Sequence, residues 1–241
     1  MGAYYFLACL LPPLPLELGE RLPLSYIEII GMIKRNIYTK DEPLLNAYLH
    51  SVDVVNWEHI DQGRNIFLEG GMLTRDDIET RNNLPPFLRD FIDEKERGAI
   101  RRPYVYDRLW ELYYIYVFEL AQKARCRFLL DFIPWEINLR NNLVDLRAKV
   151  KNTDAEPFTI LRSLGTADLS SIMTQVKGKE NPLLSEGYLD TERLKYISHC
   201  LGSNPFTLDA VLAYVSRLAI YSRWERINAP YEFYDFLYGG G

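Results

Sequence analysis

Histidine and cysteine, the side chains that most often hold zinc or iron in proteins, are scarce in this chain. The 241 residues contain three of each. The cysteines, Cys9, Cys126 and Cys200, lie far apart and are odd in number, so they suggest neither a disulfide framework nor a C-x-x-C metal site. We therefore expect no bound metal and a reducing, cytoplasmic location.

The motifs of the common enzyme classes are also missing from the sequence. There is no G-x-S-x-G elbow, and Gly178-Lys179 lacks both the first glycine and the Ser or Thr of a phosphate loop. No spacing of serine, histidine and aspartate suggests a triad. We expect a protein with no catalytic residues and no cofactor. A helical enzyme whose acids or histidines come together from distant positions is a third-ranked alternative.

A basic excess and long apolar runs are lacking as well. The net charge is −5 with a pI near 5.4, which argues against a nucleic-acid partner. The uncharged run of residues 3–16 has no basic segment before it and is interrupted by Pro12, Pro13 and Pro15. It is also shorter than the roughly 20 residues of a membrane-spanning helix. We expect this protein to reach a membrane only through partners.

The residues that are present predict an all-α protein, a multi-helix bundle with a long central helix. Hydrophobic residues make up 48% and charged residues 25%, as in ordinary folded domains. Helix starts are indicated by the capping box Ser25–Glu28 and by Asp41 before a proline, and residues 74–77 are expected to open a short helix. Residues 4–10 are expected to form a short strand or extended segment, and the aromatic tail, residues 231–238, to pack on the body. We predict one elongated domain over residues 1–241, with two sub-bundles of about 1–100 and 101–241 as its internal division.

The central stretch, residues 127–149, organises this prediction. Its apolar residues step by three or four positions and form one seam of a helix: Phe132, Trp135, Leu139, Leu143, Leu146 and Val150. The same spacing upstream, from Trp110 to Phe128, predicts about 30 residues of one long helix that is bent or broken near Pro134 and continues into the central stretch.

The face beside this seam is polar. Glu136 precedes Arg140, and Asp145 precedes Lys149, by four residues, the order that favours ion pairs along a helix. Arginine is the cation best suited to bidentate contacts at partly dry interfaces. We predict that a partner binds this face through Glu136, Arg140, Asn141, Arg147 and Lys149. A merely solvated face and an internal strut role for the arginines are the two alternatives.

Two resemblances give this face a possible context. The stretch Glu136-Ile-Asn-Leu-Arg-Asn-Asn-Leu-Val-Asp-Leu-Arg-Ala-Lys149 resembles the internal motif of the C/d-type subunit of V/A-type rotary ATPases, the all-helical cap on the membrane rotor ring. The opening, with Tyr4-Tyr-Phe-Leu7 and Leu11-Pro-Pro-Leu14, resembles a small uncharacterised bacterial family encoded in V/A-type ATPase operons.

These resemblances imply a non-catalytic subunit or accessory that couples the central stalk to the membrane rotor ring. The implied partners are central-stalk subunits and the ring, with the protein peripheral to the inner membrane through the complex. The C/d-type subunit usually has three bundles, and 241 residues leave room for two. The alternative function is an unrelated adaptor that binds proteins through the tyrosines of residues 104–116.

Overall fold

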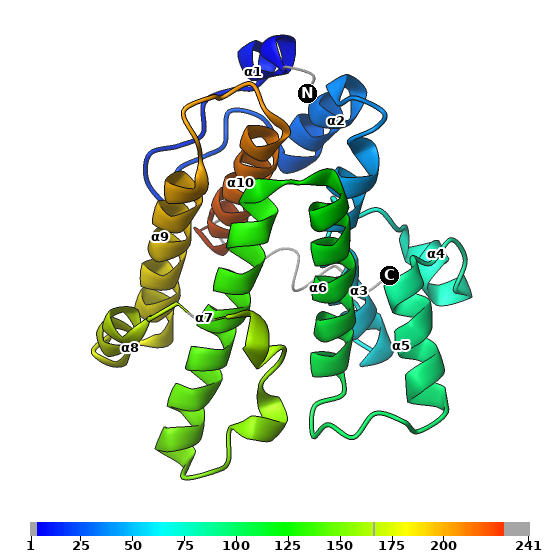
Figure 1. Ribbon diagram of the computed structural model, residues 1–241, viewed down its shortest axis with the longest axis vertical. Helices are drawn as coiled ribbons and strands as arrows, with labels where there is room; N and C mark the ends of the chain where they lie inside the picture. Colours follow the sequence, from blue (N-terminus) through cyan, green and yellow to red (C-terminus); the bar gives the residue numbers. More distant parts are fainter. Residues whose placement is uncertain (1–3, 166, 229–241) are drawn as a thin grey trace, which may run out of the picture.

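The computed structural model describes residues 4–165 and 167–228, and within these ranges its regular secondary structure is all helical, which confirms the predicted fold class (Figure 1). No strand occurs in the described ranges. The predicted tail, residues 231–238, lies outside them. The α-helices are α1 (Tyr5–Leu10), α2 (Tyr26–Asn36), α3 (Glu42–Asp61), α4 (Arg75–Thr80), α5 (Pro86–Glu96), α6 (Tyr106–Ala124), α7 (Arg127–Lys151), α8 (Ser170–Lys177), α9 (Pro182–Cys200) and α10 (Leu208–Asn228), and two 3-10 turns are η1 (Glu156–Phe158) and η2 (Arg162–Leu164).

The predicted capping box is present at α2, and the structure shows a second one at α4. At α2 the backbone N–H of Glu28 donates to Ser25 Oγ (3.3 Å), and the N–H of Ser25 donates to the Glu28 carboxylate (2.9 Å). Thr74 and Asp77 make the same reciprocal pair at α4. These contacts satisfy amide groups that have no partner inside a helix. Local sequence therefore fixes where α2 and α4 begin.

The long helix predicted to continue from Trp110 into the central stretch, with a bend or break near Pro134, is wrong in the place of its break. The chain forms two helices, α6 and α7, which pack against each other as a hairpin (Figure 1). Arg125, at φ 55°, takes the left-handed conformation that ends α6, and Asp209 caps α7 by accepting the backbone N–H of Phe128 at 2.9 Å. Pro134 lies inside α7. The break therefore occurs nine residues before the proline that was expected to cause it.

The predicted extended segment at residues 4–10 is also wrong, because residues 5–10 form α1. Two contacts of Tyr4 hold this helix on the body: its N–H donates to the Phe206 carbonyl (2.8 Å) and its hydroxyl to Asp41 (2.5 Å). Leu7, in the middle of this helix, is buried. The prolines that follow exclude a regular helix only beyond Leu11. Whether the apolar run before them is helical or extended therefore depends on these tertiary contacts.

The buried side chains form one core cluster to which both halves of the chain contribute. In Figure 1, α9 and α10 lie on one side of the α6–α7 hairpin, and α3, α4 and α5 lie on the other. The most extensive helix packing is between α3 and α6, which lie on either side of residue 100. Division into two sub-bundles stays a prediction.

The predicted seam of α7 is buried at its start and exposed at its end. Phe132, Trp135 and Leu139 are buried, whereas Leu143 is half-buried and Val150 is 76% exposed. The first half of α7 is thus a core helix. Its last two turns are more exposed, although Leu146 still packs against the core and Ala148 is buried.

We expect Leu139→Ala to lower the free energy of unfolding by about 3–5 kcal/mol, because Leu139 is fully buried and its removal leaves a cavity. Leu143→Ala is the matched change on the same seam and should cost only about 1–2 kcal/mol. Urea denaturation of both variants measures the difference. Equal losses would contradict the burial gradient along α7.

Candidate functional site

The first two residues of the predicted partner face are engaged within the chain. The Glu136 carboxylate accepts hydrogen bonds from Arg193 of α9, at 3.0 Å from Nε and 2.9 Å from Nη2. Arg140 pairs with Asp107 of α6. The predicted ion pair between Glu136 and Arg140 is therefore wrong, because each of them pairs with a residue of a neighbouring helix.

Asn141 is buried and braces a loop. Its side-chain oxygen accepts the Ile160 N–H (2.9 Å), and its amide nitrogen donates to the Ile160 carbonyl (2.7 Å). One turn earlier, Asn138 donates to the Ala167 carbonyl (2.6 Å). The chain passes so close to α7 that a Cβ on Gly165 would lie 2.5 Å from that of Asn138. The polar side chains in this part of α7 are therefore structural.

Arg147 and Lys149 are the two predicted residues that remain on the surface. Both are exposed, and neither makes an ion pair with a described residue. The expected partner of Lys149, Asp145, instead pairs with Arg162 at 2.7 Å. Only these two members of the predicted set are free to meet another molecule.

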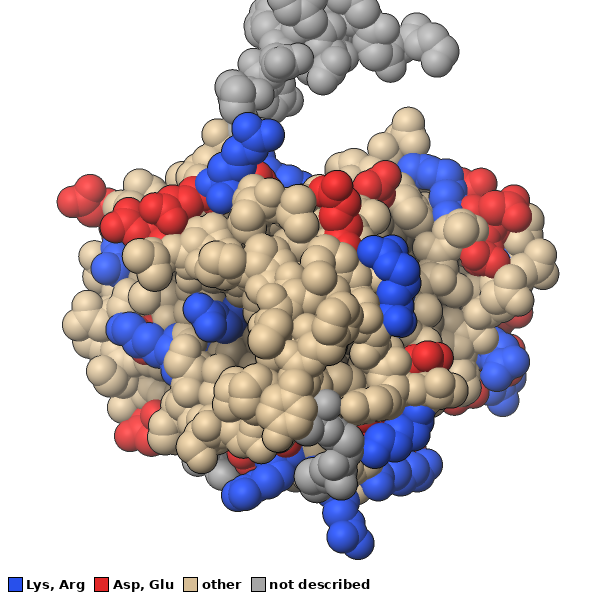
Figure 2. Space-filling view, turned by 90° about the horizontal axis from the view of Figure 1, so that it is seen from above, with Lys and Arg blue, Asp and Glu red and all other residues tan. Residues whose placement is uncertain are grey.

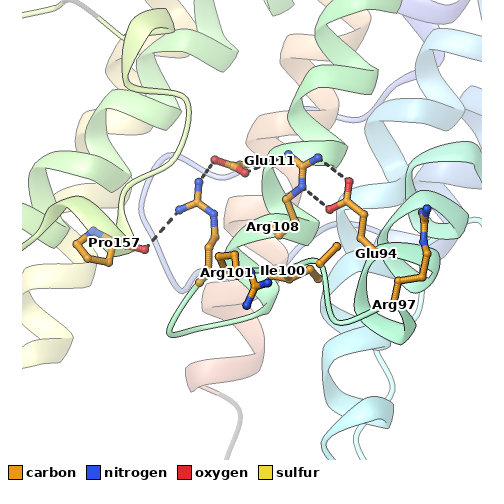
Figure 3. Close-up of a pocket in the computed structure, with 9 residues that line it drawn as sticks. Glu94, Arg97, Ile100, Arg101, Arg108, Glu111 and Pro157 are labelled. Atoms are coloured by element: carbon orange, nitrogen blue, oxygen red, sulfur yellow. Dashed lines mark hydrogen bonds and ion pairs between the residues drawn. The ribbon is translucent and has the colours of Figure 1, made fainter.

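A cleft of about 660 Å³ lies between the loop that joins α5 to α6 and the η1 turn (Figure 3). We call it the arginine cleft. The sequence alone did not predict it, because its walls come from α5, α6 and a turn some 50 residues further on. Its lining residues are Glu94, Arg97, Ala99, Ile100, Arg101, Arg102, Arg108, Glu111 and Pro157.

Ion pairs inside the arginine cleft fix two of its four arginines. Arg108 makes a bidentate contact with Glu94, at 2.7 Å from both Nε and Nη2, and this hydrogen bonding lowers the pKa of Glu94. Arg108 also reaches Glu111 (3.3 Å), which pairs with Arg102. Figure 3 shows these contacts as a chain across the cleft. Both carboxylates of the lining are thereby occupied.

The other two arginines have no acidic partner within 4.0 Å in the described structure. Arg97 donates from Nε to the Asp93 carbonyl (2.9 Å), and Arg101 makes no side-chain hydrogen bond with a described residue. Four arginines against two glutamates give the lining a net charge of +2. In a chain of net charge −5, this is a local reversal of sign. Figure 2 views the molecule from above, and on that face acidic and basic side chains are interspersed around a largely uncharged centre.

A second cleft of about 660 Å³ lies where α7, α9 and the loop after α9 meet, and it includes Asp131, Tyr196, His199 and Cys200. Burial, helped by the Asp131 carboxylate, raises the pKa of the Cys200 thiol to about 11. A thiol that stays protonated near neutral pH is a poor nucleophile. The adjacent Asp209 carboxylate already accepts the Phe128 N–H and the Cys126 thiol. The Asp209 carboxylate and the Cys126 and Cys200 thiols of this region therefore have structural roles.

Three or more His, Cys, Asp or Glu side chains placed to hold a metal ion occur nowhere in the described part of the chain. None of the described helices has the length and apolar character needed to cross a membrane. The fold and its clefts thus define a class: an all-helical protein with a charged cleft at one end.

The chain belongs to the DUF2764 family, described as a protein of unknown function, whose model matches residues 1–230. No curated protein and no solved structure matches the chain.

We expect Asn141→Ala to lower the free energy of unfolding by about 2–4 kcal/mol, since it leaves the buried N–H and C=O groups of Ile160 without partners. Lys149→Ala, on the exposed face of the same helix, should change it by less than about 0.5 kcal/mol. Chemical denaturation measures both. A loss at Lys149 as large as that at Asn141 would contradict their different roles.

The three cysteines should alkylate at different rates in the folded protein. Cys9 is exposed, Cys200 is half-buried with a raised thiol pKa, and burial also raises the pKa of Cys126. Because the thiolate is the reactive form, we expect Cys9 to react first, Cys200 more slowly and Cys126 last. Iodoacetamide labelling followed by mass spectrometry gives the order, and guanidinium chloride should abolish it. Cys200 reacting as fast as Cys9 would contradict the raised pKa.

Proposed function

We propose that this chain is a non-catalytic subunit or accessory of a V/A-type rotary ATPase, similar to the C/d-type subunit that couples the central stalk to the membrane rotor ring. One observation carries the proposal. The stretch that resembles the C/d-type subunit, residues 136–149, lies wholly within α7, which contacts α6, α8, α9 and α10. The resemblance therefore falls on the scaffold helix.

The end of this helix supports a partner-binding role. One side of the last two turns of α7 is exposed, and it carries Val150 together with the cations Arg147, Lys149 and Lys151. An apolar side chain among unpaired cations suits contact with another protein. The same end of the molecule carries the α5–α6 loop (Figure 1), so the arginine cleft adds to this surface.

The alternative adaptor, which would bind through the tyrosines of residues 104–116, has less support. Tyr106 and Tyr113 are buried in the core, and the Tyr113 hydroxyl donates to the Tyr48 carbonyl at 2.9 Å. Tyr104 is the most exposed of the five, and it already donates a hydrogen bond to Glu58. These contacts leave little of the tyrosine surface for a partner.

In this proposal the protein has a mechanical role. It acts in the cytoplasm, peripheral to the inner membrane through the complex. Its partners are central-stalk subunits and the rotor ring, and it needs neither metal nor cofactor. The arginines and acids of α7 hold the helix rigid, and the exposed end makes the contact.

The test is charge reversal at the exposed end. We expect the double variant Arg147→Glu, Lys149→Glu to stay folded with only a small loss of melting temperature, because neither side chain has an ion-pair partner in the described structure and the new carboxylates only oppose the helix dipole. It should lose copurification with V/A-type ATPase subunits when the tagged chain is isolated from cells of its source organism. Like charges at the partner's surface would then repel.

The matched control is Arg89→Glu, Lys123→Glu. It makes the same charge change at exposed positions of α5 and α6, and Lys123, like Lys149, lies in the last turn of its helix. The control should retain the ATPase subunits. If the wild-type chain captures no ATPase subunit, or if both double variants still capture them, the proposed site or function is wrong.

A further inference from the structure

The arginine cleft holds more positive charge than its own structure needs. Glu94 and Glu111 neutralise Arg108 and Arg102, and those pairs also fix the cleft wall. Arg97 and Arg101 play no such part, yet both line the cleft. Two cations without acidic partners beside a preformed network of ion pairs are a feature of sites that receive an anionic ligand.

The positions of these two arginines indicate the shape of that ligand. Figure 3 shows the side chains of Arg97 and Arg101 directed away from each other, with Ile100 between their attachment points. This placement is poorly suited to a single small anion such as phosphate. A ligand that carries two separated acidic groups would contact both.

The backbone of the cleft adds hydrogen-bond donors. The N–H groups of Ile100, Arg101 and Arg102 make no hydrogen bond with a described residue. Peptide carbonyl groups are suitable acceptors for such donors. Ile100 and Pro157 give the same lining an apolar component. These features favour a polypeptide over an inorganic or sugar-phosphate anion.

We propose that the arginine cleft binds an extended acidic segment of a partner protein. An acidic residue of that segment pairs with Arg97, an apolar residue lies against Ile100 and Pro157, and a second acidic residue pairs with Arg101. The inference rests on the proposed function in taking the chain to be a protein-binding subunit, and it adds the chemistry of the bound segment.

The test uses purified protein and a short fluorescein-labelled peptide of alternating glutamate and alanine. Fluorescence anisotropy should show binding that weakens as salt is added, whereas the glutamine–alanine and lysine–alanine peptides should not bind. The double variant Arg97→Gln, Arg101→Gln should bind the acidic peptide about tenfold more weakly. Its melting temperature should not change, since neither guanidinium group belongs to an ion pair of the fold.

The control variant is Arg64→Gln, Arg89→Gln, which removes the same charge from exposed positions outside the cleft. It should bind the acidic peptide as the wild type does. Equal weakening in both double variants would show attraction by overall charge and would overturn the proposal. Absence of peptide binding, or its full displacement by pyrophosphate at equal concentration, would also overturn it.

This measurement involves no ATPase subunit, so its result is independent of the copurification test. Loss of peptide binding to the cleft variant together with failed copurification would support the cleft and remove the ATPase assignment. Successful copurification without peptide binding would support the ATPase assignment and overturn the proposed role of the cleft.

Discussion

The packing of three helices depends on the buried carboxylate of Asp190. Only 1% of this residue is exposed, yet its carboxylate accepts hydrogen bonds from Arg193 (2.9 Å), from Arg223 and from the indole N–H of Trp224 (2.6 Å). Burial lowers the pKa of Arg193, but the carboxylates of Glu136 and Asp190 outweigh burial and raise it. Leaving the buried Asp190 carboxylate or the Arg193 guanidinium without a partner would be costly. The packing of α7, α9 and α10 that brings these partners together is therefore favoured over other packings of the three helices.

Buried polar side chains also position the long loops, because buried polar groups need hydrogen-bond partners. Asn56 pairs with both backbone groups of Leu68, at 2.7 and 2.8 Å, just as Asn141 pairs with those of Ile160. Arg102 then joins the braced segment after α7 to α6, because it donates to the Thr159 carbonyl (2.9 Å) and pairs with Glu111. The part of the arginine cleft formed by Arg102 and Glu111 is therefore held in place by the fold itself, which would lower the entropy lost if a ligand bound there.

Sequence reasoning succeeded where the causes are local and failed where they are distant. Capping boxes and the apolar spacing of α7 need only neighbouring residues, so the all-helical class and several helix starts were predictable. The partner of Glu136 is 57 residues away, so the acid-before-base spacing indicated the wrong pair. The arginine cleft was missed for the same reason. Its one local signal was the Arg101-Arg102 pair within a loop that follows Gly98.

A mechanical role would use the two halves of α7 in different ways. Force applied at Arg147 and Lys149 would act on the exposed end of the helix. The ion pairs of Asp145, Arg140 and Glu136 would transmit it to the rest of the molecule. These pairs lead to three different places: the η2 turn, α6 and α9. The pairs made by Arg140 and Glu136 lie partly out of solvent and are therefore less screened by salt than surface pairs. Because they diverge from one helix, bending α7 in any one direction would strain at least one of them. The ion pairs that engage Glu136 and Arg140 within the chain are thus the same ones that would hold α7 rigid beneath Arg147 and Lys149, the two residues of the predicted partner face that remain exposed.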